Sequence, residues 1–367
     1  MAKNKCQPSS AVTQETWNSI FCMDSEATPF QSYDWMRSIT SGGNFRNIAR
    51  RYKTPDGDAI LPLAASNGVQ MLASAASMPH GWGAGGLISS VPITVKILQE
   101  VFDDLASTPF LRLTIRPNAP QIDLWDQALP RSGWTRVPRK THILDLTGGI
   151  NVVFKERFES AKRNRIRKAQ QADLVVEKGN SPEFVKQFYE LYLLWSENRA
   201  RARGLPVFAV RRLAQLREPF WKFSVAACGM GQSLQVYVAS HQGTPVAASV
   251  FLMRGRSAVY WRGASDAALR RTYPGNDLLQ YEMIRDACEA GCLQYHMGES
   301  GGVRSLERFK EHFGAKSYCY AEYVRERLPI EAVRKATNTL IGKAAGLVAN
   351  DAQFQASRCS DWDLGRI

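Results

Sequence analysis

The segment from Leu234 to Gly263 reads LQVYVASHQGTPVAASVFLMRGRSAVYWRG. Apolar residues alternate with others along three runs, which are separated by glycine-containing turns at residues 242–244 and 254–256. Alternation with a period of two, interrupted by such turns, is typical of neighbouring antiparallel strands. The segment therefore predicts a three-stranded antiparallel meander.

The chain downstream of this meander alternates helices with strands. The expected elements are a helix that Asn276 caps, a strand at residues 293–297, a helix at 303–313 and a last strand at 318–324. The first half shows a similar order of short strands and helices, ending in a strand at residues 141–146. Repeated strand–helix order with local hairpins predicts an α/β fold.

The length of 367 residues favours two domains over one. A change of composition near Gly148 and Gly149 marks a boundary between them. We expect a first domain at residues 1–150, a second at 151–330, which contains the meander, and a helical extension at 331–367.

The basic excess of the chain is its unusual feature, with a net charge of +13. Residues 151–217 carry 15 Lys and Arg against 7 Asp and Glu, so this segment holds more than half of the excess. Such a charge favours a polyanionic partner, and phosphate contacts are expected from Lys162, Arg163, Arg165, Arg167, Lys168 and Arg203. The alternative is a solvated helix with internal ion pairs, such as Glu159 with Arg163.

Several classes of protein and site are excluded or disfavoured. No apolar run approaches the ~18–20 residues of a membrane helix, and the polar N-terminus lacks the apolar core of a signal peptide. The seven cysteines show no zinc-like spacing, so we expect reduced thiols, no metal and a cytoplasmic location. Phosphate-loop, nucleophile-elbow and H-E-x-x-H motifs are absent, and the oligomeric state stays undetermined.

The loop between the meander and the helix at Asn276 is a candidate phosphate site. A loop that enters a helix N-terminus presents free backbone N–H groups to an anion. The residues expected there are Arg262, Arg270, Arg271, Gly275 and Asn276, with Gly275 allowing close approach of the backbone. An ordinary strand–helix connection with surface arginines is the alternative.

Lys310 shares one face of its expected helix with Leu306, Phe309 and Phe313. A lysine in such a stripe either extends its ammonium group to the surface or meets a ligand from a partly buried position. Glu299 and His296, in the strand and loop before that helix, are candidate acid–base groups. The hydroxyl alternatives are Tyr260, Tyr273 and Tyr281.

Four segments stand out as motifs: RNRIRKA at residues 163–169, PGNDLL at 274–279, FK with FG at 309–314, and FQSYDW at 30–35. Together they resemble motifs of the Fem family of transferases. Members of this family carry two Gcn5-related N-acyltransferase (GNAT) folds in tandem, each a mixed, mostly antiparallel sheet flanked by helices. They move aminoacyl groups from aminoacyl-tRNA onto amines of cell-wall precursors.

The resemblance implies an acceptor-binding first domain and a donor-binding second domain. It implies that Lys310 lies near the tRNA end or the oxyanion, with Phe309 packing beside it on the donor side. We expect Lys310 and the acid–base candidate Glu299 to be the catalytic residues. The co-substrate would be aminoacyl-tRNA, with no prosthetic group, and the acceptor an amine-bearing small molecule or peptide, possibly phosphorylated.

Two other functions stay open. Related exopolysaccharide and natural-product acyltransferases share the second-domain pattern, so acyl-coenzyme A is an alternative donor for a sugar, peptide or natural-product amine. The coenzyme-binding signature Q/R-x-x-G-x-G/A is, however, absent from residues 262–275. A non-catalytic RNA-binding protein of the same fold is the other alternative.

Overall fold

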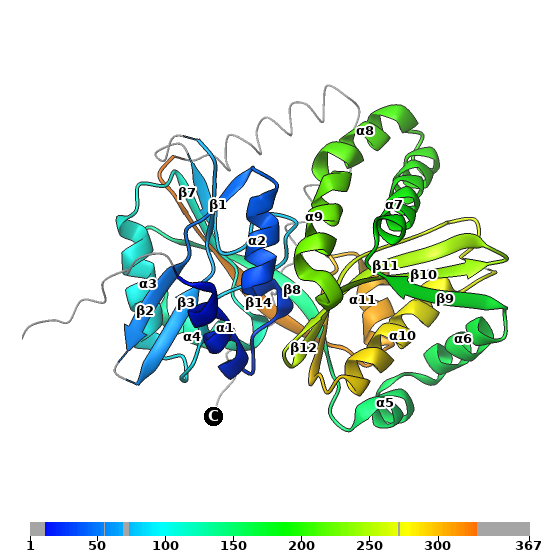
Figure 1. Cartoon of the computed structure of the whole chain (residues 1–367), viewed down its shortest axis with the longest axis horizontal. Coiled ribbons are helices and arrows are strands. Elements are labelled where there is room, and N and C mark those ends of the chain that lie inside the picture. The colour runs from blue at the N-terminus through cyan, green and yellow to red at the C-terminus, as the bar shows by residue number, and fades with distance from the viewer. Residues whose placement is uncertain (1–11, 55, 69–72, 271, 329–367) are drawn as a thin grey trace, which may run out of the picture.

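The computed structural model describes residues 12–54, 56–68, 73–270 and 272–328 (Figure 1). In this part of the chain, one mixed sheet of 11 strands runs through the molecule. In spatial order its strands are β1 (Phe45–Asn47), β4 (Ala64–Ser66), β5 (Ser74–Ala76), β7 (Arg112–Ile115), β14 (Lys316–Glu326), β8 (Thr135–Asp145), β13 (Gln294–Glu299), β12 (Ser257–Ser265), β11 (Thr244–Arg254), β10 (Leu234–His241) and β9 (Leu174–Gly179). A smaller sheet consists of β2 (Arg50–Thr54), β3 (Gly57–Leu61) and β6 (Ile88–Ser89).

The predicted meander is confirmed as β10, β11 and β12, which pair antiparallel in this order. The register of β11 against β12 shifts between Val250 and Phe251, where Trp261 has no opposite residue. Such a bulge increases the local twist of a strand and redirects the side chains beyond it. The bulge therefore changes the course of β12 just before its last residues.

Two GNAT-like halves in tandem account for the topology, which confirms the predicted fold class. Each half contains one parallel pair, β5 with β7 and β12 with β13, among otherwise antiparallel neighbours. The strands of the two halves form one continuous 11-stranded sheet, because β8 pairs with β13 on one side and with β14 on the other. The last described strand thus returns to the first half, where it also pairs with β7.

Helices flank both halves of the sheet (Figure 1). The first half carries α1 (Gln14–Met23), α2 (Tyr33–Ser41), α3 (Val95–Ser107) and α4 (Ile122–Ala128). The second half carries α5 (Gly149–Val152), α6 (Ser160–Gln170), α7 (Pro182–Ala202), α8 (Val207–Arg217), α9 (Phe220–Met230), α10 (Gly275–Glu289) and α11 (Arg304–Glu311). Asn276 is not the cap that we expected, because α10 begins at Gly275, two residues earlier than a helix capped by Asn276 would, and Pro274 is its N-cap.

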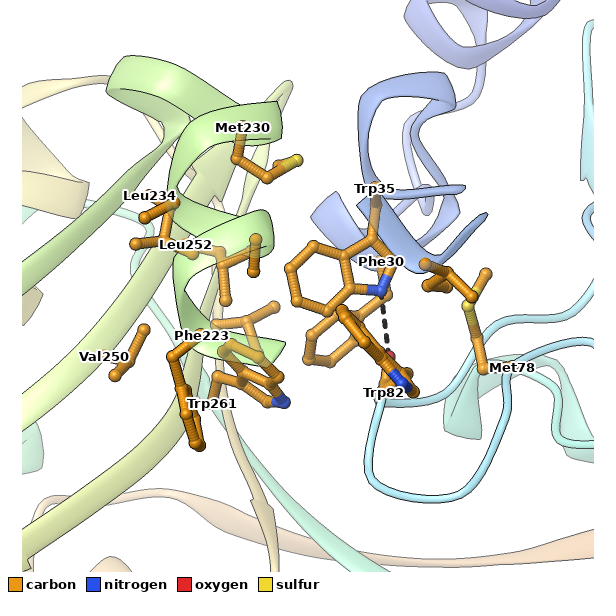
Figure 2. Close-up of a cluster of buried hydrophobic side chains, with 14 of the residues drawn as sticks. Phe30, Trp35, Met78, Trp82, Phe223, Met230, Leu234, Val250, Leu252 and Trp261 are labelled. Carbon is orange, nitrogen blue, oxygen red and sulfur yellow. Dashed lines mark hydrogen bonds between the residues drawn. The ribbon is translucent and has the colours of Figure 1, made fainter. Parts of the chain in front are cut away.

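A cluster of tryptophans joins the two halves (Figure 2). Trp35 of α2 lies 4.9 Å from Trp261 of β12 and 5.4 Å from Trp82 of the glycine-rich loop at residues 79–86, measured between ring centroids. Its indole N–H donates a 2.9 Å hydrogen bond to the Trp82 carbonyl oxygen. Because all three rings are almost completely buried, this cluster supplies a large apolar contact between the halves.

The helical extension expected at residues 331–367 lies outside the described residues. Within the described part of the chain, no helix combines the length and the apolar character that crossing a membrane requires.

Candidate functional site

A pocket of about 490 Å³ lies between the two halves, where β12 and β13 separate. These strands pair in parallel only as far as Val259 and His296. Beyond that point β12 continues along β11, while β13 continues along β8. The diverging ends, residues 259–265 and 296–299, line the pocket, so the separation of two parallel strands creates the site.

The first half supplies the opposite wall of this pocket. Gly81, Gly83 and Ala84 of the glycine-rich loop contribute there, together with Arg116 and Arg139. The Gly81 carbonyl oxygen accepts hydrogen bonds from the Trp261 indole at 3.1 Å and the Arg262 guanidinium at 3.2 Å. The loop is therefore held directly against β12 of the second half.

Lys310 of α11 lies in this pocket, with its side chain turned inward. The residue is 5% exposed, and Nζ donates hydrogen bonds to the carbonyl oxygens of Gly298 at 2.7 Å and Glu299 at 3.0 Å. Burial lowers the pKa of Lys310 to about 8, although Glu299 and Glu307 oppose this shift. An ammonium group has three N–H donors, so one remains for a ligand.

Glu299 lies at the end of β13, where its carboxylate faces charged and hydroxyl groups from other strands. Tyr320 of β14 donates a short hydrogen bond to Oε1, and Arg139 Nη1 lies 3.6 Å from Oε2. One third of the Glu299 side chain is exposed. The carboxylate is therefore positioned by its neighbours and still accessible from the pocket.

Two of the acid–base alternatives, His296 and Tyr260, line the same pocket but differ in their protonation. Burial lowers the pKa of His296 to about 4, and its Nε2 has no hydrogen-bond partner among the described residues. Burial raises the pKa of Tyr260 to about 12. At neutral pH His296 is therefore uncharged and Tyr260 carries its proton. Tyr273 and Tyr281 are not among the residues that line the pocket.

Arg262 lines the pocket, but its guanidinium group already has an internal partner. It donates a 2.8 Å hydrogen bond to Glu218, which also accepts one of 2.6 Å from the buried Lys222. Burial lowers the pKa of Lys222 to about 8, with the ammonium group over the Trp82 ring at 5.2 Å. Because Arg262 also donates to the Gly81 carbonyl oxygen of the first half, it joins the two halves in addition to lining the pocket wall.

The N-terminus of α10 reaches the pocket through Asn276, and Arg270 lies beside it. Asn276 Nδ2 donates a 3.1 Å hydrogen bond to Ser265 Oγ. Gly275 is buried against β11 instead, where a Cβ atom would come within 3.0 Å of Val246 and 3.1 Å of Ala247. Packing, rather than approach to a ligand, thus explains that glycine, and Arg271 lies outside the described residues.

Lys162 lies in the protein interior, unlike the surface phosphate contact that we expected. Its Nζ lies 2.5 Å from Asp277 of α10 and 4.3 Å from the centre of the Phe309 ring. Burial lowers the pKa of Lys162, while Asp277 opposes the shift. Because Phe309 also lines the pocket, Lys162 supports this wall of the pocket from behind.

The other expected phosphate contacts lie outside the pocket. Arg163 donates hydrogen bonds to the carbonyl oxygens of Lys155 and Phe158. It therefore connects the first turn of α6 to the segment just before this helix. The exposed members are Arg165, Arg167, Lys168 and Arg203. Arg165 also pairs with Asp277. The structure thus brings together Lys310, Glu299, Phe309, Arg262, Arg270 and Asn276, and leaves the basic helix as a separate surface.

Sequence reasoning missed a buried ion cluster in the pocket wall. Glu322 of β14 accepts hydrogen bonds from Arg116 at 2.6 Å and from Arg139 at 2.8 Å. The two guanidinium groups lower the pKa of Glu322, although burial opposes the shift. Glu322 lies 206 positions from Arg116 and 183 from Arg139 in the chain, and no local motif marks these residues.

Comparison with known proteins agrees with this architecture. Residues 157–311 match the family model described as acetyltransferase (GNAT) domain. The crystal structure of FemX is similar with a TM-score of 0.66 and 13% identity, covering 90% of this chain and 99% of that one.

Two further solved structures share the fold. One is the C-terminal domain of a putative lysylphosphatidylglycerol synthetase from Agrobacterium fabrum, with a TM-score of 0.52, 13% identity, and coverage of 89% of this chain and 96% of that one. The other is a conserved protein of unknown function from Bacteroides thetaiotaomicron, with a TM-score of 0.52, 12% identity, and coverage of 85% and 97%. No curated protein matches the chain in sequence.

Proposed function

We propose that this chain, whose tandem fold is similar to that of FemX and whose residues 157–311 match a GNAT domain, is an acyltransferase that transfers an aminoacyl group from aminoacyl-tRNA to an amine. The pocket between the halves is the reaction site in this proposal. Its donor side is the gap between β12 and β13, and its acceptor side is the wall from the first half. We expect the protein to act in the cytoplasm, where charged tRNA is available.

One observation carries the proposal: the Lys310 ammonium group and the Glu299 carboxylate lie in the same pocket, at the point where two parallel strands part. Acyl transfer to an amine develops negative charge on the acyl oxygen and releases a proton from nitrogen. A buried cation with a remaining N–H donor suits the first change. An accessible carboxylate suits the second.

The reaction follows from these two groups. The acceptor nitrogen attacks the acyl carbonyl carbon, forming the C–N bond, and Lys310 donates a hydrogen bond to the oxyanion. Glu299 accepts the proton that the nitrogen loses and can return it to the departing ester oxygen as the C–O bond breaks. An aminoacyl ester is already activated towards amines, so binding and orientation contribute much of the rate.

The tRNA donor is supported by the exposed cations of α6, namely Arg165, Arg167 and Lys168. Their contacts would be sensitive to salt, since they release counterions from the RNA backbone. A coenzyme A donor is supported by another observation, the α10 N-terminus with Arg270 at the pocket edge. Acyl-coenzyme-A-dependent N-acyl transfer is therefore the second candidate.

The test incubates the protein with amine mixtures and either charged total tRNA or acyl-coenzyme A, and detects acylated products by mass. Product that disappears after treatment of the donor with RNase supports the tRNA donor. Product that resists RNase and requires acyl-coenzyme A overturns it. If no donor supports transfer and the protein still binds RNA, the proposal that it is an acyltransferase is wrong, and the RNA-binding alternative remains.

A further inference from the structure

Helix α8 carries an unusual concentration of exposed apolar side chains. In the described part of the chain ten large apolar side chains are exposed, and five of them lie between Phe208 and Trp221. Three of the five lie on α8, and the other two, Phe220 and Trp221, begin α9. Phe208 is 81% exposed, Leu216 67% and Leu213 46%. Scattered exposed leucines are common on protein surfaces, but a cluster on one short helix marks a contact surface.

The packing of α8 turns these side chains outward. Figure 1 shows α8 beside α7, at the upper edge of the molecule. Ala214 is buried and Arg211 pairs with Glu197 of α7, so these residues mark the inner face of α8. Phe208, Arg212 and Leu216 follow one another at intervals of four, which places them along one stripe of the outer face.

The surroundings of this stripe are strongly basic. Residues 199–217 contain six arginines and no acidic residue. Glu197 pairs with two of the arginines, Arg201 and Arg211. Arg203, Arg212 and Arg217 are exposed. The outer face of α8 therefore combines apolar side chains with an excess of positive charge.

We propose that the outer face of α8 docks on the surface of an anionic lipid bilayer. A helix with apolar side chains between arginines lies in the interface, with the apolar groups below the headgroups and the cations among them. Arginines alone would suit RNA equally well, but RNA offers no site for the two exposed leucines. The bilayer accommodates both kinds of side chain, and this contact is independent of the identity of the acyl donor.

The test measures sedimentation of the full chain with vesicles of phosphatidylcholine alone or with phosphatidylglycerol added. We expect binding to the anionic vesicles, weakening as salt increases. The combined variant F208S/L213S/L216S should bind at least about tenfold more weakly, because three apolar side chains no longer enter the interface. R212S should lose about fivefold, the contribution of one basic residue near an anionic surface.

Matched controls separate docking from general effects. Met23→Ser with Val175→Ser removes exposed apolar side chains elsewhere, and Arg256→Ser removes an exposed arginine from a turn. These variants should bind like the wild type, and thermal unfolding should confirm that all variants are folded. Wild-type protein that stays in solution overturns the proposal. Undiminished vesicle binding by the triple variant also overturns the proposal, whether or not total tRNA releases the protein from the vesicles.

Discussion

Replacement of Lys310 by methionine should separate catalysis from stability. Methionine has a similar length and keeps the apolar packing of the side chain, but it removes the charge and the N–H donors. Loss of one donor to an oxyanion typically lowers kcat about 10²–10³-fold. We expect a loss of this size, with little change in the affinity for donor or acceptor.

The stability of this variant follows from two opposing effects. A pKa lowered from 10.5 to about 8 means that burying the charged lysine costs about 3 kcal/mol, which methionine relieves. The carbonyl oxygens of Gly298 and Glu299 lose their donor, at a cost of about 1–3 kcal/mol. The free energy of unfolding should therefore stay within about 2 kcal/mol of the wild type at pH 7.

The pH dependence gives a further readout. The folded pKa of Lys310 lies below its ordinary value, so this residue raises the stability of the wild type as the pH increases from about 8 towards 10.5. The protonated form is the hydrogen-bond donor, so kcat should fall above pH 8 in the wild type. The methionine variant should lack both effects.

The assays are steady-state transfer kinetics and urea unfolding between pH 6 and 10. Lys140→Met is the matched control, since Lys140 is a neighbouring surface lysine paired with Glu307, and it should keep the wild-type kcat. If Lys310→Met retains more than a tenth of the wild-type kcat, the oxyanion role is wrong. If it unfolds several kcal/mol more easily, the residue acts mainly through structure.

Other substitutions test the base, the loop and the ion cluster. Glu299→Gln should lower kcat about 10²–10⁴-fold in transfer assays, since the amide cannot accept the proton; an unchanged kcat would exclude it as the base. Gly83→Ala should cost several kcal/mol in urea unfolding, because its Cβ would lie 2.4 Å from the Phe30 ring. Gly43→Ala, with positive φ but open space, should cost only about 1–2 kcal/mol; equal losses would contradict the steric argument. Glu322→Gln should cost about 3–5 kcal/mol at pH 7 by leaving two arginines without their carboxylate. The lowered pKa of Glu322 means that the stability which this carboxylate and its two arginines give the wild type is lost as the pH falls below about 4.5. If the free energy of unfolding of the variant falls with the same pH dependence in acid, this explanation is wrong.

Much of the second half could be predicted because its signals are local. Alternation at residues 234–263 specified the meander, and helical spacing placed Lys310 on the same face as Phe309 and Phe313. Both depend on neighbours within a few positions of the chain. The sequence allowed the Lys310 side chain to point either to the surface or into the pocket. Its inward orientation depends on β13, whose residues Gly298 and Glu299 accept its hydrogen bonds.

The buried charges could not be predicted from local pattern. Lys162 belongs to a run of basic residues that looks solvated throughout, yet it pairs with Asp277, more than a hundred positions away. A buried cation needs a partner, but the sequence does not show which acid the fold brings near. The same applies to Glu322 and its two arginines.

The sequence by itself determined the order of the elements from residue 234 to residue 324, the basic excess and the candidate groups Lys310 and Glu299. Hydrophobic periodicity and turn-forming residues act over a few positions, so a local sequence pattern predicts the elements and the helix face on which Lys310 lies. Only the tertiary structure decided that β8 and β14 join two sheets into one, and that β12 and β13 part to open a pocket against the first half. Strand pairing across hundreds of residues depends on the packing of whole halves, which no local pattern encodes.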